Sequence, residues 1–213
     1  SGKAVWTYSD VQGFVECRAY VDNEQVVFGS WGNRLYSLNP QTGALQWEWR
    51  CEKPSRMYSP AAVWPVKADG KIFIAVPDRR LYALEAATGK ELRHYERAAR
   101  EAVGVSPDGT KVYCKSMWHT ITSVDATSLE IDWQTETGAG YEISPTSIIS
   151  IGDEVIMPTD KGNIIGFSAK DGSWLWARKI SIALVNPMEV WAEGGSTFIL
   201  ASTMDGTVTL LRR

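Results

Sequence analysis

The sequence predicts an all-β protein, a β-propeller built from four-stranded antiparallel blades. A cassette recurs along the chain: residues 35–47 and 81–93 share an apolar strand, a turn of the Thr-Gly type and a second strand, and looser copies begin at Ile121 and Ile164. The copies are spaced by roughly forty residues, the length of one propeller blade. No stretch of the sequence has the apolar spacing of a long amphipathic helix.

Ahead of each cassette lies a segment rich in β-branched and aromatic residues, which is typical of a strand. These strands are expected at residues 25–30, 71–76, 111–116, 154–159 and 197–202. Short clusters of Asp, Asn and Gly flank them, and these residue types tolerate the positive φ of tight hairpins. Each unit is therefore predicted to be a meander of antiparallel strands.

We expect one domain over residues 1–213, because the units of a repeat array share their core with their neighbours. The predicted blades cover residues 14–50, 58–96, 101–135, 143–179 and 186–213. The fifth unit stops where its outermost strand should begin, and residues 1–8 resemble such a strand. We therefore expect residues 1–8 to complete the fifth blade and close the ring without a free edge. The alternative is a fragment of a longer array of about seven or eight blades.

Composition narrows the classes of partner. The chain of 213 residues has a formal net charge of -3, so a general electrostatic footprint for nucleic acid is missing. No apolar run approaches the roughly 20 residues that cross a bilayer. The three cysteines are far apart and form no CxxC pair, so we expect neither a disulfide framework nor a zinc site. We expect a monomer without a membrane span.

The cassette resembles the pyrroloquinoline-quinone-like (PQQ-like) repeat, whose mark is Ala-x-Asp-x-x-Thr-Gly-Lys-x-x-Trp. Residues 37–47 resemble it over their whole length, residues 83–93 end in Arg93 instead of tryptophan, residues 123–133 lack the glycine, and residues 166–176 keep it. The resemblance implies that the terminal tryptophans dock between adjacent blades. By position these are Trp6, Trp47, Trp133 and Trp176.

The resemblance does not extend to the quinone. Quinone-binding members carry vicinal cysteines and a calcium held by carboxylate and amide oxygens, and this chain has no Cys-Cys pair. We therefore expect no cofactor and no metal. His94 and His119 lack patterned neighbours that could complete a metal site. Carboxylates near the starts of the innermost strands could form an acidic funnel or be scattered solvated groups, and they are Glu16, Glu101, Glu142 and Glu189.

Chain direction reverses with each strand, so the turns between second and third strands emerge on the same face as the connections between blades. Arginine and aromatic residues, which are enriched at protein interfaces, gather in these segments. The candidate binding residues are Trp31, Arg50, Arg56, Arg80, Arg97, Trp118 and Tyr141. Trp31 and Trp118 are the sharpest candidates, since a turn has no blade to bury a ring against, although both rings could fold back over the blade edges.

The sequence thus predicts a non-catalytic module for protein interaction or ligand recognition, with a protein partner or an attached catalytic domain. The resemblance implies an exported bacterial protein of the periplasm or cell surface. One alternative is an accessory substrate-binding domain of a hydrolase such as a metallophosphoesterase. Others are an enzyme acting on an anionic or sugar substrate, and nucleic-acid binding through the basic loops.

Overall fold

The computed structural model describes residues 2–51, 60–76, 79–96, 99 and 102–213. Within these residues the regular structure is strand, apart from one short 3-10 helix at Pro60–Ala62. The strands form five antiparallel sheets in which neighbours in space are also neighbours along the chain. The prediction of an all-β chain of antiparallel blades is therefore confirmed.

Four sheets have four strands and the last has three. The first sheet contains β1 (Tyr20–Val21), β2 (Val26–Ser30), β3 (Arg34–Leu38) and β4 (Leu45–Arg50). The second contains β5 (Val66–Ala68), β6 (Lys71–Val76), β7 (Arg80–Glu85) and β8 (Glu91–Tyr95). The third contains β9 (Val103–Val105), β10 (Lys111–Lys115), β11 (Trp118–Asp125) and β12 (Ile131–Tyr141). The fourth contains β13 (Ile149–Ile151), β14 (Glu154–Pro158), β15 (Asn163–Ser168) and β16 (Trp174–Lys179), and the fifth contains β17 (Glu189–Glu193), β18 (Ser196–Ser202) and β19 (Val208–Arg212).

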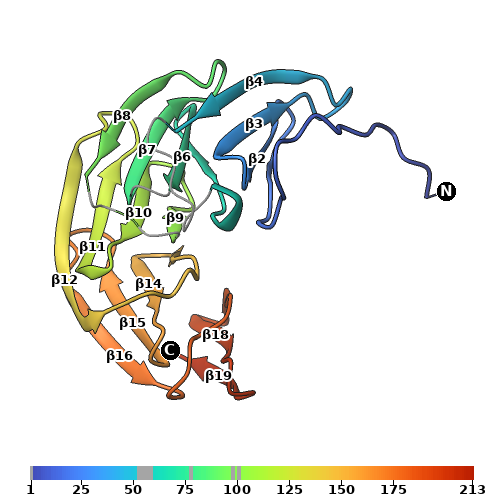
Figure 1. Ribbon diagram of the computed structural model, residues 1–213. Helices are drawn as coiled ribbons and strands as arrows, with labels where there is room; N and C mark the ends of the chain where they lie inside the picture. Colours follow the sequence, from blue (N-terminus) through green and yellow to red (C-terminus); the bar gives the residue numbers. More distant parts are fainter. Residues whose placement is uncertain (1, 52–59, 77–78, 97–98, 100–101) are drawn as a thin grey trace.

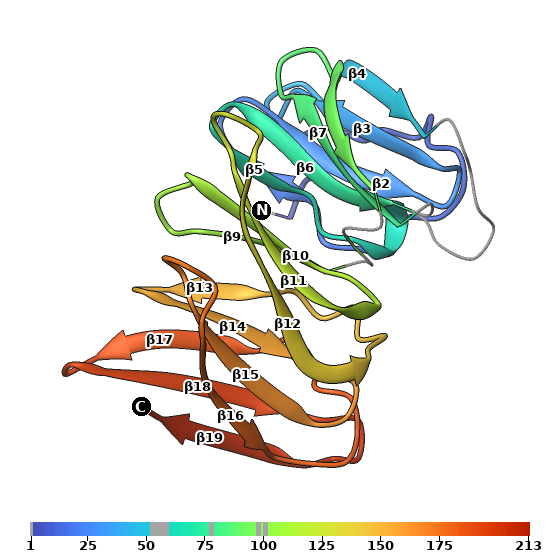
Figure 2. The ribbon, with the colours of Figure 1, turned by 90° about the vertical axis from the view of Figure 1, so that its left-hand side faces the viewer.

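The core lies between successive sheets. Burial is greatest in the two middle strands of each of the first four sheets. In the second, third and fourth sheets these strands lie between two neighbouring sheets, whereas one face of the first sheet packs on the N-terminal segment. One apolar cluster joins the first three sheets, a second joins the third and fourth, and a third joins the fourth and fifth. The sheets follow one another along an arc (Figure 1), with the first sheet at one end and the fifth at the other (Figure 2).

The expected closure of the ring by residues 1–8 is wrong for the described part of this segment. Residues 2–8 pair with no strand, and β19 is the outermost strand of the fifth sheet. Instead the segment lies against the first sheet, where Trp6 and Tyr8 pack on the cluster around Tyr36. The chain termini consequently lie well apart (Figure 1).

The contacts of the N-terminal segment explain this placement. The Trp6 indole N–H donates to the Pro40 carbonyl oxygen at 2.9 Å, and its ring covers Gly43. Further along the chain, the backbone N–H groups of Trp31 and Gly32 donate to the carbonyl oxygens of Phe14 and Gln12 at 2.8 and 3.0 Å. A cassette tryptophan docks on the blade that follows it, and for Trp6 that blade is the first.

Docking of tryptophan between blades is confirmed at two further junctions. The Trp47 indole N–H donates to the Ala86 carbonyl oxygen at 2.8 Å, and the Trp133 indole donates to the Ala169 carbonyl oxygen at 3.1 Å. Each ring lies on the glycine of the next Thr-Gly-type turn: a Cβ added at Gly89 would lie 2.6 Å from the Trp47 ring. The glycine is therefore required both for its positive φ and for the space that it leaves.

The junction between the second and third sheets uses a different pair. Arg93 stands at the tryptophan position, and Leu129 replaces the glycine of the next turn with a φ of 60°. The Arg93 guanidinium forms an ion pair with Glu130, and the Tyr95 hydroxyl donates to the Leu129 carbonyl oxygen at 2.8 Å. The two departures from the repeat pattern therefore occur together, and they replace a stacking contact by a polar one.

Trp176 is the exception among the predicted docking residues. Its indole N–H donates to Glu154 of its own sheet at 2.8 Å, and its ring lies over Gly166. The guanidinium of Arg213 covers the ring at 4.6 Å from its centroid. The Trp176 ring therefore packs over its own blade in the described structure.

The cassette turns are fixed by an Asx side chain. The Asn39 side-chain oxygen accepts hydrogen bonds from the backbone N–H groups of Gln41 and Thr42, at 3.0 and 2.9 Å. In the third sheet Asp125 accepts from Thr127 and Ser128 at 3.0 and 2.9 Å. An aspartate and an asparagine therefore make the same turn, and only the aspartate titrates.

We expect stability to fall in acid through these turns. The hydrogen bond from the Ser128 N–H, together with Lys111, lowers the pKa of Asp125 to about 2, and hydrogen bonds also lower the pKa values of Asp171 and Asp205 to about 2. A lowered carboxyl pKa stabilises the fold above the unfolded value, near 3.8, and this contribution is lost as the pH falls toward 2. Thermal unfolding should show that the Asp125→Asn variant loses less stability than the parent between these two pH values. Equal losses would contradict a contribution of the Asp125 carboxylate to the acid sensitivity.

Candidate functional site

Two of the predicted binding residues meet on the face that carries the β10–β11 turn. Trp118 begins β11 and Tyr141 ends β12, and the two residues are opposite one another in the strand register. Their rings pack edge to face with centroids 5.7 Å apart and an interplanar angle of 67°. Trp118 is 52% exposed and Tyr141 is 49% exposed. The pair therefore presents aromatic surface to solvent while each ring restrains the other.

The turn that carries Trp118 is held by its own hydrogen bonds. The Ser116 hydroxyl oxygen accepts from the backbone N–H of Trp118 at 3.1 Å and from that of Thr120 at 3.3 Å. His119 has a φ of 75°, so the turn uses the left-handed region at a residue other than glycine. The hydrogen-bonded backbone of this turn thus fixes the position from which the Trp118 side chain extends.

The residue that follows Tyr141, Glu142, belongs to a buried ion pair. The Lys115 ammonium is 3.3 Å from Oε1 of Glu142, and both side chains are only 2% exposed. The ammonium also donates to the Pro158 carbonyl oxygen at 2.9 Å. The Glu142 carboxylate accepts from the backbone N–H groups of Ser144 and Asp160 at 2.8 and 2.9 Å. The network joins β10, the connection after β12 and the β14–β15 turn.

Burial raises the pKa of Glu142, and the positive charge of Lys115 acts in the opposite direction. On the solvent side the Lys161 ammonium donates to the carbonyl oxygens of Ala139 and Tyr141. Backbone from the third and fourth sheets is thereby fixed around Tyr141. The candidate site is a rigid one, built on two blades.

The other predicted residues do not join this pair. Trp31 lies in the β2–β3 turn, where its indole N–H donates to the Glu16 carboxylate at 2.9 Å and its ring remains partly exposed. Arg50 is exposed at the end of β4. Arg80 forms an ion pair with Glu96 and donates to the Tyr82 hydroxyl at 3.4 Å. Arg56 and Arg97 lie outside the described residues.

The acidic funnel considered from the sequence is not formed by the described carboxylates. Glu142 is buried against Lys115, Glu16 binds Trp31, and Glu189 is exposed at the start of β17. Glu101 lies outside the described residues. The inner strands of the first four sheets surround a cavity of about 390 Å³ whose described lining includes Arg18 and no carboxylate. The Arg18 guanidinium lies 5.9 Å from the centroid of the Trp64 ring in that lining. The cavity is aromatic and weakly cationic.

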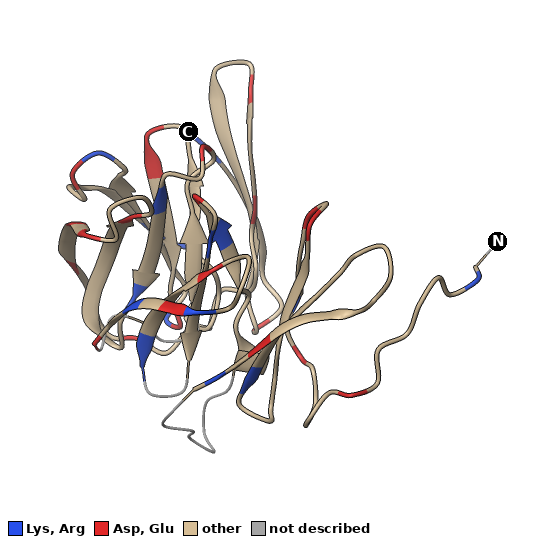
Figure 3. Ribbon diagram, turned by 90° about the horizontal axis from the view of Figure 1, so that it is seen from above, with Lys and Arg blue, Asp and Glu red and all other residues tan. Residues whose placement is uncertain are grey.

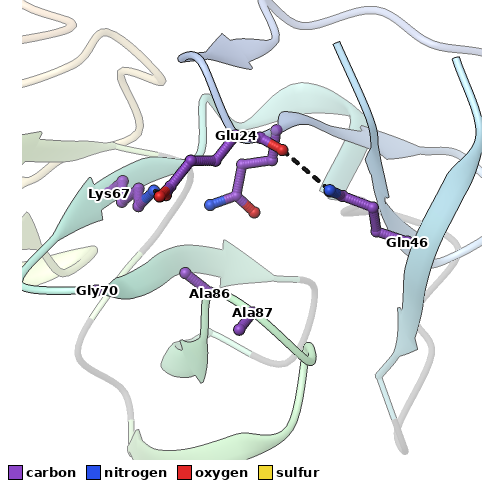
Figure 4. Close-up of a pocket in the computed structure, with 7 residues that line it drawn as sticks. Glu24, Gln46, Lys67, Gly70, Ala86 and Ala87 are labelled. Carbon is purple, nitrogen blue, oxygen red and sulfur yellow. Dashed lines mark hydrogen bonds and ion pairs between the residues drawn. The ribbon is translucent and has the colours of Figure 1, made fainter. Parts of the chain in front are cut away.

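A second cavity, of about 360 Å³, lies between the first and second sheets (Figure 4). Lys67 on its wall is 2.7 Å from Asp22 and 2.7 Å from Glu24, and the Gln46 amide donates to the Glu24 carbonyl oxygen at 2.9 Å. Ala86, which accepts the Trp47 indole, also lines it. The cavity is part of the junction at which Trp47 docks, and its polar groups pair with one another.

Among the described residues, no group of three or more His, Cys, Asp and Glu side chains is close enough to hold a metal ion. His94 is exposed and lies 2.7 Å from Glu91 of its own strand. Cys17, Cys51 and Cys114 are free thiols, as their spacing predicted. Lysine, arginine and carboxylate residues are interspersed over the described ribbon (Figure 3). The described part of the chain has no helix of the length and apolarity that would let it traverse a lipid bilayer.

Comparison with known families decides the repeat type. A PQQ-like repeat model, described as "Outer membrane protein assembly factor BamB", matches residues 1–114 and again residues 60–191. The chain belongs to the PQQ-like repeat family. The predicted resemblance is therefore confirmed over most of the chain's length. No curated protein matches the chain at a significant level.

Solved structures agree on the fold. The computationally designed Ika8 protein superposes with a TM-score of 0.72 at 13% identity, covering 90% of this chain and 56% of that one. Sqt1 of Saccharomyces cerevisiae gives 0.72 at 12% identity, with 89% and 55% covered. The quinohemoprotein alcohol dehydrogenase ADHIIG of Pseudomonas putida HK5 gives 0.72 at 14% identity, with 95% and 41% covered. This PQQ-like chain thus spans about half the length of Ika8 and Sqt1.

Proposed function

We propose that this PQQ-like chain is a non-catalytic protein-binding module whose contact surface is centred on Trp118 and Tyr141. The observation that carries the proposal is the exposed edge-to-face pair, with its ring centroids 5.7 Å apart. The buried ion pair involves Glu142, the residue that follows Tyr141. Tyrosine and tryptophan are the residue types that most often anchor protein interfaces. A ring held in place before binding loses little conformational entropy on association.

The family supports a protein partner. Its model is described as an outer membrane protein assembly factor, a protein that works together with other proteins. On that likeness we propose that the chain is part of an exported bacterial protein of the periplasm or cell surface. We propose Trp31, in the β2–β3 turn of the first sheet, as a second contact residue for the same partner.

Site-specific photo-crosslinking in cells tests this function. A benzophenone amino acid placed at Tyr141 should give a discrete adduct with one protein, because this position lies at the centre of the proposed contact. The matched control is Trp174, an exposed tryptophan at the start of β16, which should give no such adduct. Absence of an adduct at Tyr141, or the same adduct at both positions, would reject the proposed surface.

A further inference from the structure

A groove of about 500 Å³ lies between the outer parts of the third and fourth sheets, on the outer rim of the arc (Figure 1). One wall is the end of β12, residues 136–139. The other wall is formed on β15 and β16 by Asn163, Ile165, Trp174 and Ala177. The volume falls within the range of about 300–1,000 Å³ that is usual for small-molecule sites.

The length of β12 provides the first wall. This strand has 11 residues, whereas β4 and β16 have six each and β8 has five. Its pairing with β11 is interrupted after Glu136 and resumes at Tyr141, with Gly138 and Gly140 at φ values of 66° and 72° between them. Ala139, in the interrupted segment, packs on the apolar cluster shared by the third and fourth sheets. The segment therefore lies beside the fourth sheet and forms a groove at this junction.

An exposed aromatic ring lies at one end of the groove. Trp174 is 55% exposed and pairs with Phe167, on the face of the fourth sheet that packs on the third. Its indole N–H has no acceptor within the described part of the chain. Leu45, Glu91 and Ile131 occupy the same position of the cassette in the first three sheets. The fold therefore does not require an aromatic residue at this position.

A polar side chain lies at the other end of the groove. Asn163 directly precedes its cassette, as Arg34 and Arg80 do in the first two sheets, where each arginine forms an ion pair with a glutamate. The side-chain amide of Asn163 has no partner among the described residues. Four residues of β15 separate it from the level of Trp174, a distance of about 13 Å along a strand. The groove thus offers a free donor and acceptor at one end and a flat apolar ring at the other.

The charge of the groove narrows the class of ligand. Glu136 is the one ionisable residue in the described lining, so an anionic ligand would meet repulsion and no cation. The ammonium groups of Lys161 and Lys179, on the neighbouring backbone, donate to backbone carbonyl oxygens. A single ring is also not the aromatic cage that encloses a quaternary ammonium group. An elongated, uncharged ligand with both apolar faces and hydroxyl groups fits best.

We propose that this groove binds an uncharged oligosaccharide of β-1,4-linked hexopyranose units. Such units have flat C–H faces that stack on an exposed tryptophan ring, and their hydroxyl groups both donate and accept hydrogen bonds. Trp174 holds the face of one unit, and the amide of Asn163 binds hydroxyl groups of a unit farther along the chain. A β-1,4-linked chain is extended, so it follows the groove from one residue to the other. The inference goes beyond the proposed protein-binding function and does not depend on Trp118.

Isothermal titration calorimetry with cellotetraose tests the site. The parent chain should bind this tetrasaccharide, and Trp174→Leu should weaken the affinity about tenfold or more, because the stacked ring is lost. Leucine is the residue that the first sheet carries at this position, so the variant should keep the melting temperature of the parent. Trp174→Tyr retains a ring and should recover most of the affinity. Asn163→Ala should weaken binding by about fivefold, the effect of a lost hydrogen bond.

Two controls make the result specific. Trp191→Leu removes a partly exposed tryptophan of β17 that lies outside the groove, and the affinity should not change. Maltotetraose, whose α-1,4 linkages curve the chain, should bind more weakly than cellotetraose. Absence of heat with cellotetraose at millimolar concentration, equal losses in Trp174→Leu and Trp191→Leu, or equal affinity for the two sugars would each overturn the proposal. Binding of a tetra-alanine peptide that is lost in Trp174→Leu would overturn it in favour of a peptide groove.

Discussion

Replacing Trp133 by alanine is expected to lower the free energy of unfolding by about 3–5 kcal/mol, the range found when a large aromatic side chain is removed from a core. The ring is almost fully buried between the third and fourth sheets, where it packs near Tyr113 with centroids 6.0 Å apart. Its indole N–H is bonded to the Ala169 carbonyl oxygen at 3.1 Å. The variant therefore loses the contacts of the ring and leaves the partly buried Ala169 carbonyl oxygen without this donor.

Trp176→Ala is the matched control, because it removes the same side chain at the same cassette position. Trp176 is only half-buried and folds back over Gly166 of its own blade, so its removal should cost clearly less than that of Trp133. Urea unfolding followed by circular dichroism gives both free energies. Equal losses in the two variants would contradict a difference in docking.

A second variant approaches the same contact from the other side. Gly172→Ala introduces a Cβ that would lie 2.4 Å from the Trp133 ring, at a residue with a φ of 71°. In the parent it should displace the ring as well as strain the turn. In the Trp133→Ala background only the backbone strain remains. The double variant should therefore lose less free energy of unfolding than the sum of the losses in the two single variants.

The sequence was sufficient to predict the docking of Trp47 and Trp133, because both the tryptophan and its receiving glycine lie inside one repeated cassette. It was also sufficient to reveal where the pattern changes, at Arg93 and Leu129, although the ion pair with Glu130 that replaces stacking became visible only in the structure. A periodic pattern states which residues face the next blade. It does not state which alternative contact forms when the pattern is broken.

Closure of the ring could not be predicted in this way. Residues 1–8 match the outer strand of a blade, but the match does not distinguish the strand pairing from the tryptophan docking. In the structure the docking of Trp6 on Gly43 is present while the pairing with the fifth sheet is missing. Whether five blades form a ring or an arc depends on the small rotation between neighbouring sheets. That rotation arises from side-chain packing at each junction, which no single repeat encodes.

The candidate site was predicted in parts. Trp118 and Tyr141 were each expected on the loop face, but their pairing requires β12 to continue to Tyr141, beyond residue 135, where the third blade was expected to end. Glu142 was considered as a channel carboxylate and is instead buried. Its partner, Lys115, ends β10 directly after Val112, Tyr113 and Cys114. A cation in that position was the one available signal of a buried ion pair.

Like Trp133→Ala, the Lys115→Met variant should therefore have a strongly lowered free energy of unfolding. It retains most of the apolar stem and removes the charge that faces Glu142, and breaking a buried ion pair costs about 3–5 kcal/mol. The carboxylate is left with the backbone N–H groups of Ser144 and Asp160 as its donors among the contacts described above. Because the ammonium also bonds to Pro158, the β14–β15 turn should loosen as well, and Trp118 should lose part of its near-ultraviolet circular dichroism.

The pH dependence of this variant distinguishes loss of charge compensation from loss of packing. Burial already raises the pKa of Glu142 in the parent, and removal of the Lys115 charge should raise it further. A carboxyl group whose folded pKa lies above its unfolded pKa binds more protons when folded, so stability falls as the pH rises through that interval. The deficit of Lys115→Met relative to the parent should thus be smallest in mild acid and grow toward neutral pH. Adding Glu142→Gln should recover part of the lost stability at neutral pH, since the neutral amide keeps an acceptor oxygen for the backbone N–H groups. A stability deficit that does not change with pH and is not reduced in the double variant would show that Lys115 contributes through packing alone.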